Sequence, residues 1–288
     1  MERRSWPLSE SAQPALSLRT MGDRSGDDDR ETDTDPDIPG PSPVDDDSDF
    51  DLASSAPTEL ARGLLERVRR KERTEQFRQS LADLNEPSLS AVRTERQTAL
   101  AFWLNVYNAA VQLLLDRRPA LFESRWRFFR APAVTVAGVE LSLDDIELGI
   151  LRGRKSKYGL GYLPRLGRTG LSAAYRLDAD PRIHFALNCG AVSCPAVLAY
   201  TPETVDETLD NATETYLNGT VEYDADRDRV TLPRVCLWFV GDFGGRSGLR
   251  SFLREFGQIP TDATPSLRFH EYNWRKAPRK FADRRRQG

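Results

Sequence analysis

The chain has 288 residues, of which 39% are hydrophobic and 30% charged, which is enough apolar material for one sizeable core. Its formal net charge of −3 is unevenly spread, because residues 1–57 hold 5 basic and 15 acidic residues while the remainder carries a net charge of +7. Three cysteines exclude a disulfide-rich scaffold, no continuous apolar run approaches the ~20 residues of a membrane span, and the mild basicity of the remainder does not favour nucleic-acid binding. We therefore expect a cytoplasmic protein with reduced thiols and neither a nucleic-acid nor a membrane partner.

Three regions are predicted along the chain. Residues 1–56 form an acidic tail whose dense like charge and few large apolar residues predict disorder, because such a segment cannot bury enough surface to offset its ordering entropy. A folded domain is expected over residues 57–275, and residues 276–288 form a basic C-terminal tail. The acidic tail could contact a protein or peptide partner, which the sequence does not identify.

The first half of the domain is predicted to be helical. Residues 58–84, TELARGLLERVRRKERTEQFRQSLADL, space their apolar side chains as an amphipathic helix does, with a break near Thr74 and an end before Pro87. Residues 94–119, TERQTALAFWLNVYNAAVQLLLDRRP, predict a second helix that stops before Pro119. Its apolar residues lie on all sides, so this helix should be buried on most of its surface.

The second half mixes short strands with helices. We expect two strands around Ala137 and Gly138, a helix capped by Ser142, and a long, weakly patterned connection over residues 153–180. The elements expected after it are a buried strand at 182–189, a helix at 201–218 capped by Thr201, a hairpin at 221–232, a helix at 248–257 and a last strand at 266–274. This order predicts an α+β fold, a helical N-terminal half packed on a small mixed, mainly antiparallel sheet.

The stretch HFALNCGAVSCP, residues 184–195, holds one of the two histidines and two of the three cysteines. Cys189 follows the expected strand and precedes glycine, and such a junction exposes a side chain and free N–H groups, as a nucleophile requires. Cys194 precedes Pro195, and if a short helix begins there its dipole would lower the pKa of the thiol. The alternative is that both cysteines are small buried residues beside a tight turn.

Two histidines could serve as the base for a cysteine nucleophile. On a straight strand, His184 and Cys189 would be roughly 16 Å apart and on opposite faces, so they could pair only if the chain bends sharply. Cys194 could come closer to His184 if the segment turns back, and His270 could reach Cys189 from a neighbouring strand. A structural role is the alternative for each histidine.

Polar residues elsewhere offer further candidates. Asn105 and Asn108 are three residues apart and share a helix face, where a buried amide must find specific hydrogen-bond partners. Asp144, Asp145 and Glu147 form either a favourable charge set at a helix start or part of a site. The C-x4-C spacing is not a redox C-x-x-C motif, and the sequence lacks paired metal-ligand spacing and a phosphate-binding loop, so no metal or cofactor is predicted.

Five segments in order, FWLNVYNA, GVELSLDDIELGILRG, DPRIHFALNCGAVSCPAVLAYTPETVDETLD, VCLWFVGDFGG and HEYNW, resemble the DUF547 family over roughly residues 60–275. The resemblance implies a shared fold, while the chemistry of that family is largely uncharacterised. Plant relatives often carry serine at position 194, which argues against a shared disulfide, and relatives often have histidine at Leu148. The family motifs fall on Asn105, Tyr107, Asn108, Asp145, Glu147, His184, Asn188, Cys189, Gly190, Cys194, Pro195, Asp242 and Phe243.

Three hypotheses for the function follow. The first is a thiol-dependent hydrolase or acyltransferase, with Cys189 as nucleophile, His184 or His270 as base, and Asn105, Asn108 or Asn188 orienting the base or binding the oxyanion. The second is a non-catalytic binding or scaffold module in which asparagine, histidine and cysteine form a structural network. The third is a dithiol redox protein that uses Cys189 and Cys194.

Overall fold

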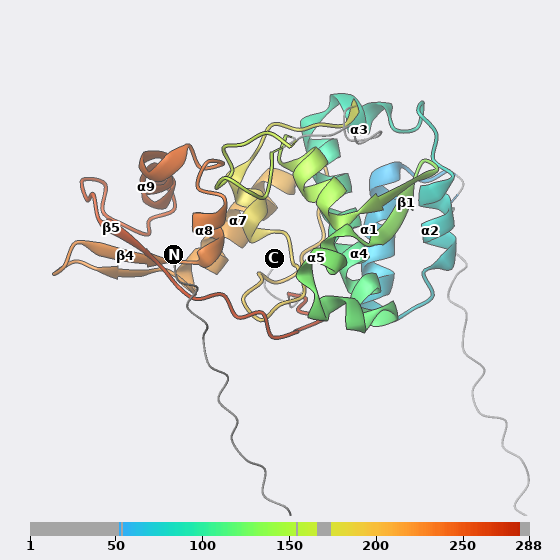
Figure 1. Ribbon diagram of the computed structural model, residues 1–288. Helices are drawn as coiled ribbons and strands as arrows, with labels where there is room; N and C mark the ends of the chain where they lie inside the picture. The colour runs from blue at the N-terminus through green and yellow to red at the C-terminus, as the bar shows by residue number, and fades with distance from the viewer. Residues whose placement is uncertain (1–51, 53, 154, 166–173, 283–288) are drawn as a thin grey trace, which may run out of the picture. The chain divides into compact units, whose positions relative to one another are not determined.

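One long helix, α4 (Arg96–Arg117; Figure 1), supplies more side chains to the larger of the two hydrophobic clusters than any other element. The computed structural model describes residues 52, 54–153, 155–165 and 174–282, which belong to the second of two units, residues 1–48 and 49–288. The predicted acidic tail, apart from residues 52 and 54–56, lies outside the described residues, as do residues 283–288 of the predicted basic tail.

Burial of α4 is continuous from Ala99 to Leu115, which confirms the prediction of a helix buried on most sides. By length and composition alone this helix could cross a membrane, but 94% of its most apolar window is buried inside the protein. Its apolar residues therefore have protein partners all round, as in the core helix of a globular domain. The helix ends two residues before Pro119, whose ring cannot continue it.

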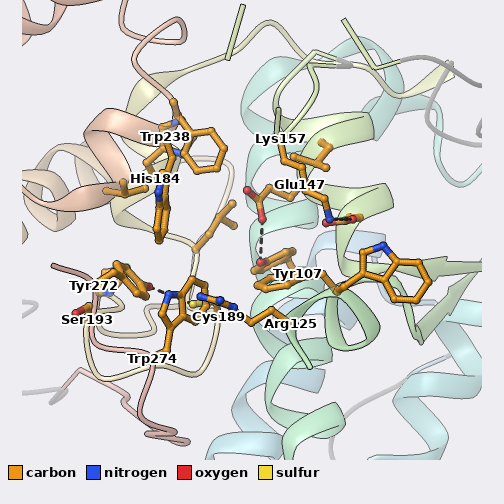
Figure 2. Close-up of a pocket in the computed structure, with 18 of the residues that line it drawn as sticks. Tyr107, Arg125, Glu147, Lys157, His184, Cys189, Ser193, Trp238, Tyr272 and Trp274 are labelled. Atoms are coloured by element: carbon orange, nitrogen blue, oxygen red, sulfur yellow. Dashed lines mark hydrogen bonds and ion pairs between the residues drawn. The ribbon is translucent and has the colours of Figure 1, made fainter. Parts of the chain in front are cut away.

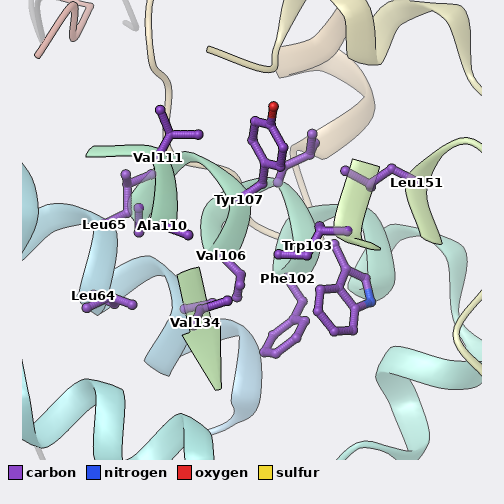
Figure 3. Packing of buried hydrophobic residues seen from close by; sticks show 14 of the residues in the cluster. Leu64, Leu65, Phe102, Trp103, Val106, Tyr107, Ala110, Val111, Val134 and Leu151 are labelled. Carbon is purple, nitrogen blue, oxygen red and sulfur yellow. The ribbon is translucent and has the colours of Figure 1, made fainter. Parts of the chain in front are cut away.

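Three other N-terminal helices contribute side chains to the same hydrophobic cluster. They are α1 (Pro57–Arg70), α2 (Glu75–Ala82) and α3 (Ser90–Thr94), with the predicted break at Thr74 directly before α2. Figure 3 shows Leu65 of α1 beside Ala110 on one side of α4, and Val134 beside Val106 on the side that faces strand β1. After α4 come the short helices η1 (Pro119–Glu123) and α5 (Arg125–Arg130).

Two small sheets form where one was expected. Strands β1 (Pro132–Val136) and β2 (Val139–Ser142) pair antiparallel around Ala137 and Gly138, as predicted. Strands β3 (Glu222–Asp224), β4 (Arg229–Leu232) and β5 (Ser266–Phe269) form a separate mixed sheet, antiparallel between β3 and β4 and parallel between β4 and β5. Helices and small sheets together confirm the α+β class.

A second hydrophobic cluster gathers around the three-stranded sheet. It includes side chains from β4, from helices α8 (Arg234–Trp238) and α9 (Gly245–Glu255), and from the end of α7 (Val205–Asn218). The predicted cap of α7 is wrong by three residues, because Thr204 rather than Thr201 precedes the helix. The two threonine hydroxyls instead bond each other at 3.1 Å.

The predicted strand at 182–189 is wrong, and this error matters for the site. The chain forms a short 3₁₀ helix, η3 (Pro181–Phe185). Asp180 caps this helix, because its carboxylate accepts a hydrogen bond from the N–H of Arg182 at 3.0 Å. Proline at the first helical position and an aspartate cap favour a helical start over an apolar run that otherwise suits a strand. The chain therefore bends before Cys189, and the distance argument against a shared site no longer holds.

Candidate functional site

A cavity of about 530 Å³ lies beside α4 and is lined by residues of both hydrophobic clusters and of the loops between them. Figure 2 shows His184, Trp238, Tyr272 and Trp274 on one side and Tyr107, Glu147 and Lys157 on the other, with Cys189 between. The volume is within the ~300–1,000 Å³ typical of small-molecule sites. Besides these residues, the lining consists of Arg125, Trp126, Phe129, Asp144, Leu148, Tyr158, Leu187, Ser193, Pro195, Tyr216, Val235 and Phe239.

The two cysteines of the HFALNCGAVSCP stretch form a close pair. Their Sγ atoms are 2.6 Å apart, and both lie near the Tyr272 hydroxyl, at 3.2 Å from Cys189 and 3.1 Å from Cys194. Cys189 lines the cavity, whereas Cys194 is buried behind it. None of the three cysteines of the chain forms a disulfide bond, so this contact is between two thiols.

Backbone N–H groups point at the inner sulfur. The Cys194 Sγ accepts from the N–H of Cys189 at 3.1 Å and from that of Ala191 at 3.4 Å. Pro195 does not begin a helix, so the condition under which a helix dipole would lower the pKa of Cys194 is not met, and the donors come from the turn around Gly190 instead. Gly190 has a φ of +86°, a conformation that glycine adopts without strain, and this turn brings the two N–H groups together.

The environment separates the acidities of the two thiols. Burial alone would raise the pKa of Cys194, but hydrogen bonds from the Cys189 thiol, the Tyr272 hydroxyl and the two N–H groups outweigh it and lower this pKa to about 7. The same contact with Cys194, together with burial, raises the pKa of Cys189 well above its ordinary value. The pair therefore loses its first proton near neutral pH and holds the second firmly, as coupled groups do.

Buried amides hold the thiol loop, residues 186–195, which carries Cys189 and Cys194. Asn108 of α4 donates to the carbonyl of Ala186 at 3.1 Å and accepts from the N–H of Asn188 at 3.0 Å. The Asn188 side chain in turn donates to the Pro195 carbonyl and accepts from the N–H of Gly190. Both asparagines use their amide nitrogen and oxygen in these bonds, so their visible role is to fix the backbone of the thiol loop.

Asn105 fixes the backbone of a later segment, at Tyr200, in the same way. Its side chain donates to the carbonyl of Tyr200 at 2.8 Å and accepts from the N–H of the same residue at 3.0 Å. The C-terminal segment completes the support, since the Ala277 N–H donates to the Gly190 carbonyl and Lys280 to the Cys194 carbonyl. The described part of the predicted basic tail, residues 276–282, thus packs on the thiol loop.

We expect Asn108→Ala to destabilise the protein markedly. The change leaves the Ala186 carbonyl and the Asn188 N–H buried without a partner, and each such group costs about 1–3 kcal/mol. Urea unfolding followed by tryptophan fluorescence measures the loss, and Asn211→Ala, which removes an exposed amide from α7, is the matched control. Equal stability of the two variants would contradict the bracing role of Asn108.

His184 reaches the cavity but is engaged elsewhere. Its Nε2 lies 2.9 Å from the Asp242 carboxylate, and its ring stacks on Phe239 with centroids 4.4 Å apart. Burial lowers the pKa of His184, against the opposing effect of Asp242. Among the described residues, neither histidine forms a hydrogen bond to a thiol. The histidine is therefore neutral at neutral pH and shares a cavity with Cys189 without bonding it.

Asp242 is the centre of a buried charge cluster. Its carboxylate bonds Arg152 at 2.7 Å and Lys155 at 3.0 Å as well as His184. Burial would raise the pKa of Asp242, but the hydrogen bonds from His184 and Arg152 hold it well below its usual range. The Arg152 guanidinium lies 4.0 Å from the centroid of Phe239, the ring on which His184 stacks. This cluster fixes one wall of the cavity.

The remaining predicted site residues lie in different places. His270 follows β5 and its Nε2 lies 3.1 Å from the Thr220 carbonyl; it does not line the cavity. Asp145 forms a reciprocal cap with Ser142 at the start of η2 (Asp145–Leu151) and pairs with Arg165 at 2.8 Å. Ser142 thus bonds the first turn as predicted, although the segment that follows is a π-helix.

Glu147 faces the cavity from η2 and is paired with Tyr107, whose hydroxyl donates to its carboxylate at 3.1 Å. Burial raises the pKa of Glu147, so its carboxylate binds a proton more readily than an exposed glutamate. Burial raises the pKa of Tyr107 too, and the charges of Glu147, Cys189 and Cys194 add to this shift. Leu148, the position at which relatives often have histidine, lines the same cavity.

The aromatic wall was missed in the sequence. Trp238, Tyr272 and Trp274 follow or end short apolar segments, a place where large aromatic residues are usually core. Their signal in the sequence was their place in two segments that resemble the DUF547 family, VCLWFVGDFGG for Trp238 and HEYNW for Tyr272 and Trp274. As for metals, the described residues contain no group of three or more His, Cys, Asp or Glu side chains arranged to hold one.

Comparison with known proteins gives one match. The family described as "Protein of unknown function, DUF547" matches residues 91–217, which span α4, the hairpin, η2, the thiol loop and most of α7. No curated protein and no solved structure matches the chain. The match covers Tyr107, Glu147, His184 and both paired cysteines, whereas the wall formed by Trp238, Tyr272 and Trp274 lies outside it.

Proposed function

We propose that this chain, which belongs to the DUF547 family over residues 91–217, carries out thiol–disulfide exchange at the Cys189–Cys194 pair. The observation that supports this most strongly is the 2.6 Å separation of the two sulfurs, which places them close enough for a disulfide bond of about 2.05 Å to form with a small shift. Because relatives often carry serine at position 194, the proposal concerns this chain and not the whole family. A cytoplasmic location would keep the pair reduced between reactions.

Cys189 and Cys194 differ in their access to the cavity and in their pKa, and this difference assigns each a role. Cys189 lines the cavity and is the sulfur that a substrate can meet, whereas Cys194 is buried and carries the thiolate near neutral pH. A proton can pass from Cys189 to Cys194 along their direct contact. Cys189 is then the nucleophile, and Cys194 first accepts its proton and later resolves the intermediate.

The reaction balances with a disulfide, R–S–S–R′, as oxidant. The Cys189 sulfur, its proton transferred to Cys194, attacks one sulfur of the substrate, the S–S bond breaks, and R–S⁻ leaves. The Cys194 thiol gives its proton to R–S⁻, and its sulfur attacks Cys189. A Cys189–Cys194 disulfide forms and R′–S⁻ leaves, so two electrons pass from the pair to the substrate.

Alkylation of the reduced protein across pH tests the acidity on which the proposal depends. We expect the rate of iodoacetamide modification at Cys189 to rise with a midpoint near pH 7, because the first proton leaves the pair there, below the ~8.5 of a free cysteine. Peptide mass spectrometry assigns the modified residue. Cys236 is buried with its pKa raised to about 12 by burial, so it should stay unmodified in the native protein and serves as an internal control.

The outcome that contradicts the proposal is equally specific. If Cys189 is unreactive in the native state, or if mild oxidation by a small disulfide yields no Cys189–Cys194 bond, exchange chemistry fails. An inert Cys189 would favour the binding-module hypothesis, in which the asparagine, histidine and cysteine contacts are only structural.

Thiol-dependent acyl transfer is the second candidate, because His184, which is bonded to Asp242, lines the same cavity as Cys189. In that reaction the Cys189 sulfur would attack an acyl carbon, His184 would take the thiol proton and pass it to the leaving group, and water would release the acid. The two candidate reactions use different substrates, a disulfide for exchange and an acyl compound such as an ester for acyl transfer. A burst of alcohol from an activated ester that persists in a Cys194→Ser variant would favour acyl transfer over exchange.

A further inference from the structure

Aromatic ring surfaces make up much of the cavity that leads to Cys189. Trp238, Tyr272 and Trp274 lie together, with ring centroids 4.6 to 5.7 Å apart. Trp126 and Tyr158 also line the cavity and remain 59% and 62% exposed. Large aromatic rings left open to water at a concave site favour an apolar, planar partner, because stacking adds to the gain from burying the rings.

Cations outnumber carboxylates along the same surface. A polar recess adjoins the aromatic cavity and shares with it Asp144, Leu148, Lys157 and Tyr158. Asp144 is neutralised by Lys157 at 2.7 Å and lies 3.7 Å from Arg130, and Asp145 is neutralised by Arg165. The two joined spaces therefore hold the cations Arg125, Arg130, Lys157 and Arg165 against the carboxylates of Asp144, Asp145 and Glu147.

Two residues of this surface differ in whether they are already bonded. Glu147 is buried, and its carboxylate already accepts a hydrogen bond from Tyr107. Arg125 forms no ion pair within the described residues; its guanidinium instead lies 4.5 Å from the centroid of Trp274. An unpaired guanidinium held against an aromatic face can bond a carboxylate while the ring contacts the rest of the molecule.

We infer that the cavity binds a molecule in which a planar aromatic group is joined to an anionic group. The aromatic group would lie against the rings of Trp238 and Trp274, and the anion would bond Arg125. The inference extends the proposed function by naming the class of molecule that reaches Cys189, which for exchange would be an aromatic acid that bears a disulfide. Binding itself does not depend on the thiols reacting.

Titration of the full-length protein with three unreactive probes tests this. We expect 2-naphthoate to bind about tenfold more tightly than 2-naphthol, which corresponds to about 1.4 kcal/mol, and 2-naphthylmethylammonium to bind most weakly. Calorimetry gives the dissociation constants. The preference for the acid should fall as salt is raised, because part of it is an ion pair near solvent.

Paired variants identify the contacts. Arg125→Gln should remove most of the preference for naphthoate over naphthol while leaving naphthol binding in place, and Trp238→Ala should weaken both probes. Arg127→Gln is the matched control, because Arg127 is an exposed arginine on the same helix that does not line the cavity. Bound naphthoate should also slow alkylation of Cys189.

Several results would overturn the inference: equal affinity for acid and alcohol, tightest binding of the ammonium probe, no saturable binding, or an equal loss of preference in Arg127→Gln. The proposed function and this inference fail separately. A Cys189→Ala and Cys194→Ala double variant should lose exchange but keep its naphthoate preference. Exchange without that preference refutes the inference alone, whereas the preference without exchange refutes the function alone.

Discussion

Asp242→Asn is expected to lower the free energy of unfolding by about 3–5 kcal/mol, the cost of leaving a buried charge without its partner. The side chains of Arg152 and Asp242 are 0% and 1% exposed, so water cannot replace the lost carboxylate. A loss of this size is a large part of the ~5–15 kcal/mol by which a typical domain is stable. Urea unfolding at neutral pH, followed by tryptophan fluorescence, measures it.

Control substitutions separate charge from packing. Asp224→Asn makes the same chemical change in an exposed ion pair with Arg227 and should leave stability unchanged. Adding Arg152→Met to Asp242→Asn should restore part of the loss, because the buried positive charge goes with it. If Asp242→Asn unfolds at the same urea concentration as the parent, the cluster does not brace the cavity wall.

The pH dependence of the same measurement has a definite sign. The pKa of Asp242 is depressed in the folded state, so between that pKa and the ordinary value near 3.9 the unfolded chain binds the extra proton. The stabilisation by Asp242 is therefore fully present above about pH 4–5 and is lost as pH falls further. The difference between parent and Asp242→Asn should shrink in that acid range.

His184 makes the stability of the parent protein depend on pH in a second, higher pH range. Its pKa is lowered by burial, so below the ordinary value near 6.5 the unfolded chain takes up a proton before the folded one does. Stability should therefore begin to fall as pH drops below about 6.5, before the carboxylate contributes. This earlier loss should be absent from a His184→Asn variant.

Sequence patterns predicted the helical half well and the site loop poorly. The apolar residues around the whole of α4 and the proline just after its C-terminal end fix that element with little help from the rest of the fold. In residues 182–189 the apolar pattern suits a strand equally well, but Pro181 and the hydrogen bond that the N–H of Arg182 donates to the Asp180 carboxylate favour a helical start. Short apolar runs are ambiguous in this way because local caps decide between helix and strand.

In the candidate site, too, some features could be predicted from the local sequence and others could not. Asn105 and Asn108 could be predicted as bonded, buried amides because an unpaired amide inside an apolar helix is too costly. The partners of His184 could not, since Asp242 and Arg152 lie 58 and 32 residues away along the chain and meet it only in the folded protein. The pairing of Cys189 with Cys194 depends likewise on a positive-φ turn at Gly190 that spacing alone does not reveal.

Cys194→Ala is expected to stop exchange at its first step and leave a mixed disulfide on Cys189. In the reduced parent, an aromatic disulfide such as 5,5′-dithiobis(2-nitrobenzoate) should release both of its halves, because the Cys194 sulfur already lies 2.6 Å from the sulfur it must attack. Without Cys194, the second half can leave only by attack of an external thiol. Intramolecular attack by a positioned group has an effective concentration far above that of any added thiol, so release of the second half should slow by about 10²-fold or more.

The acidity of the remaining thiol should change in the same variant. Cys194 carries the thiolate near neutral pH because the Cys189 thiol, the Tyr272 hydroxyl and two N–H groups stabilise it there. With Cys194 gone, Cys189 stays partly buried and loses its proton acceptor, so the midpoint for its alkylation should move from about 7 to 8.5 or above. Cys236→Ala removes a cysteine that takes no part and should behave as the parent in both measurements. Release of both halves at the parental rate from Cys194→Ala would show that the pair, however close, does not act as one unit.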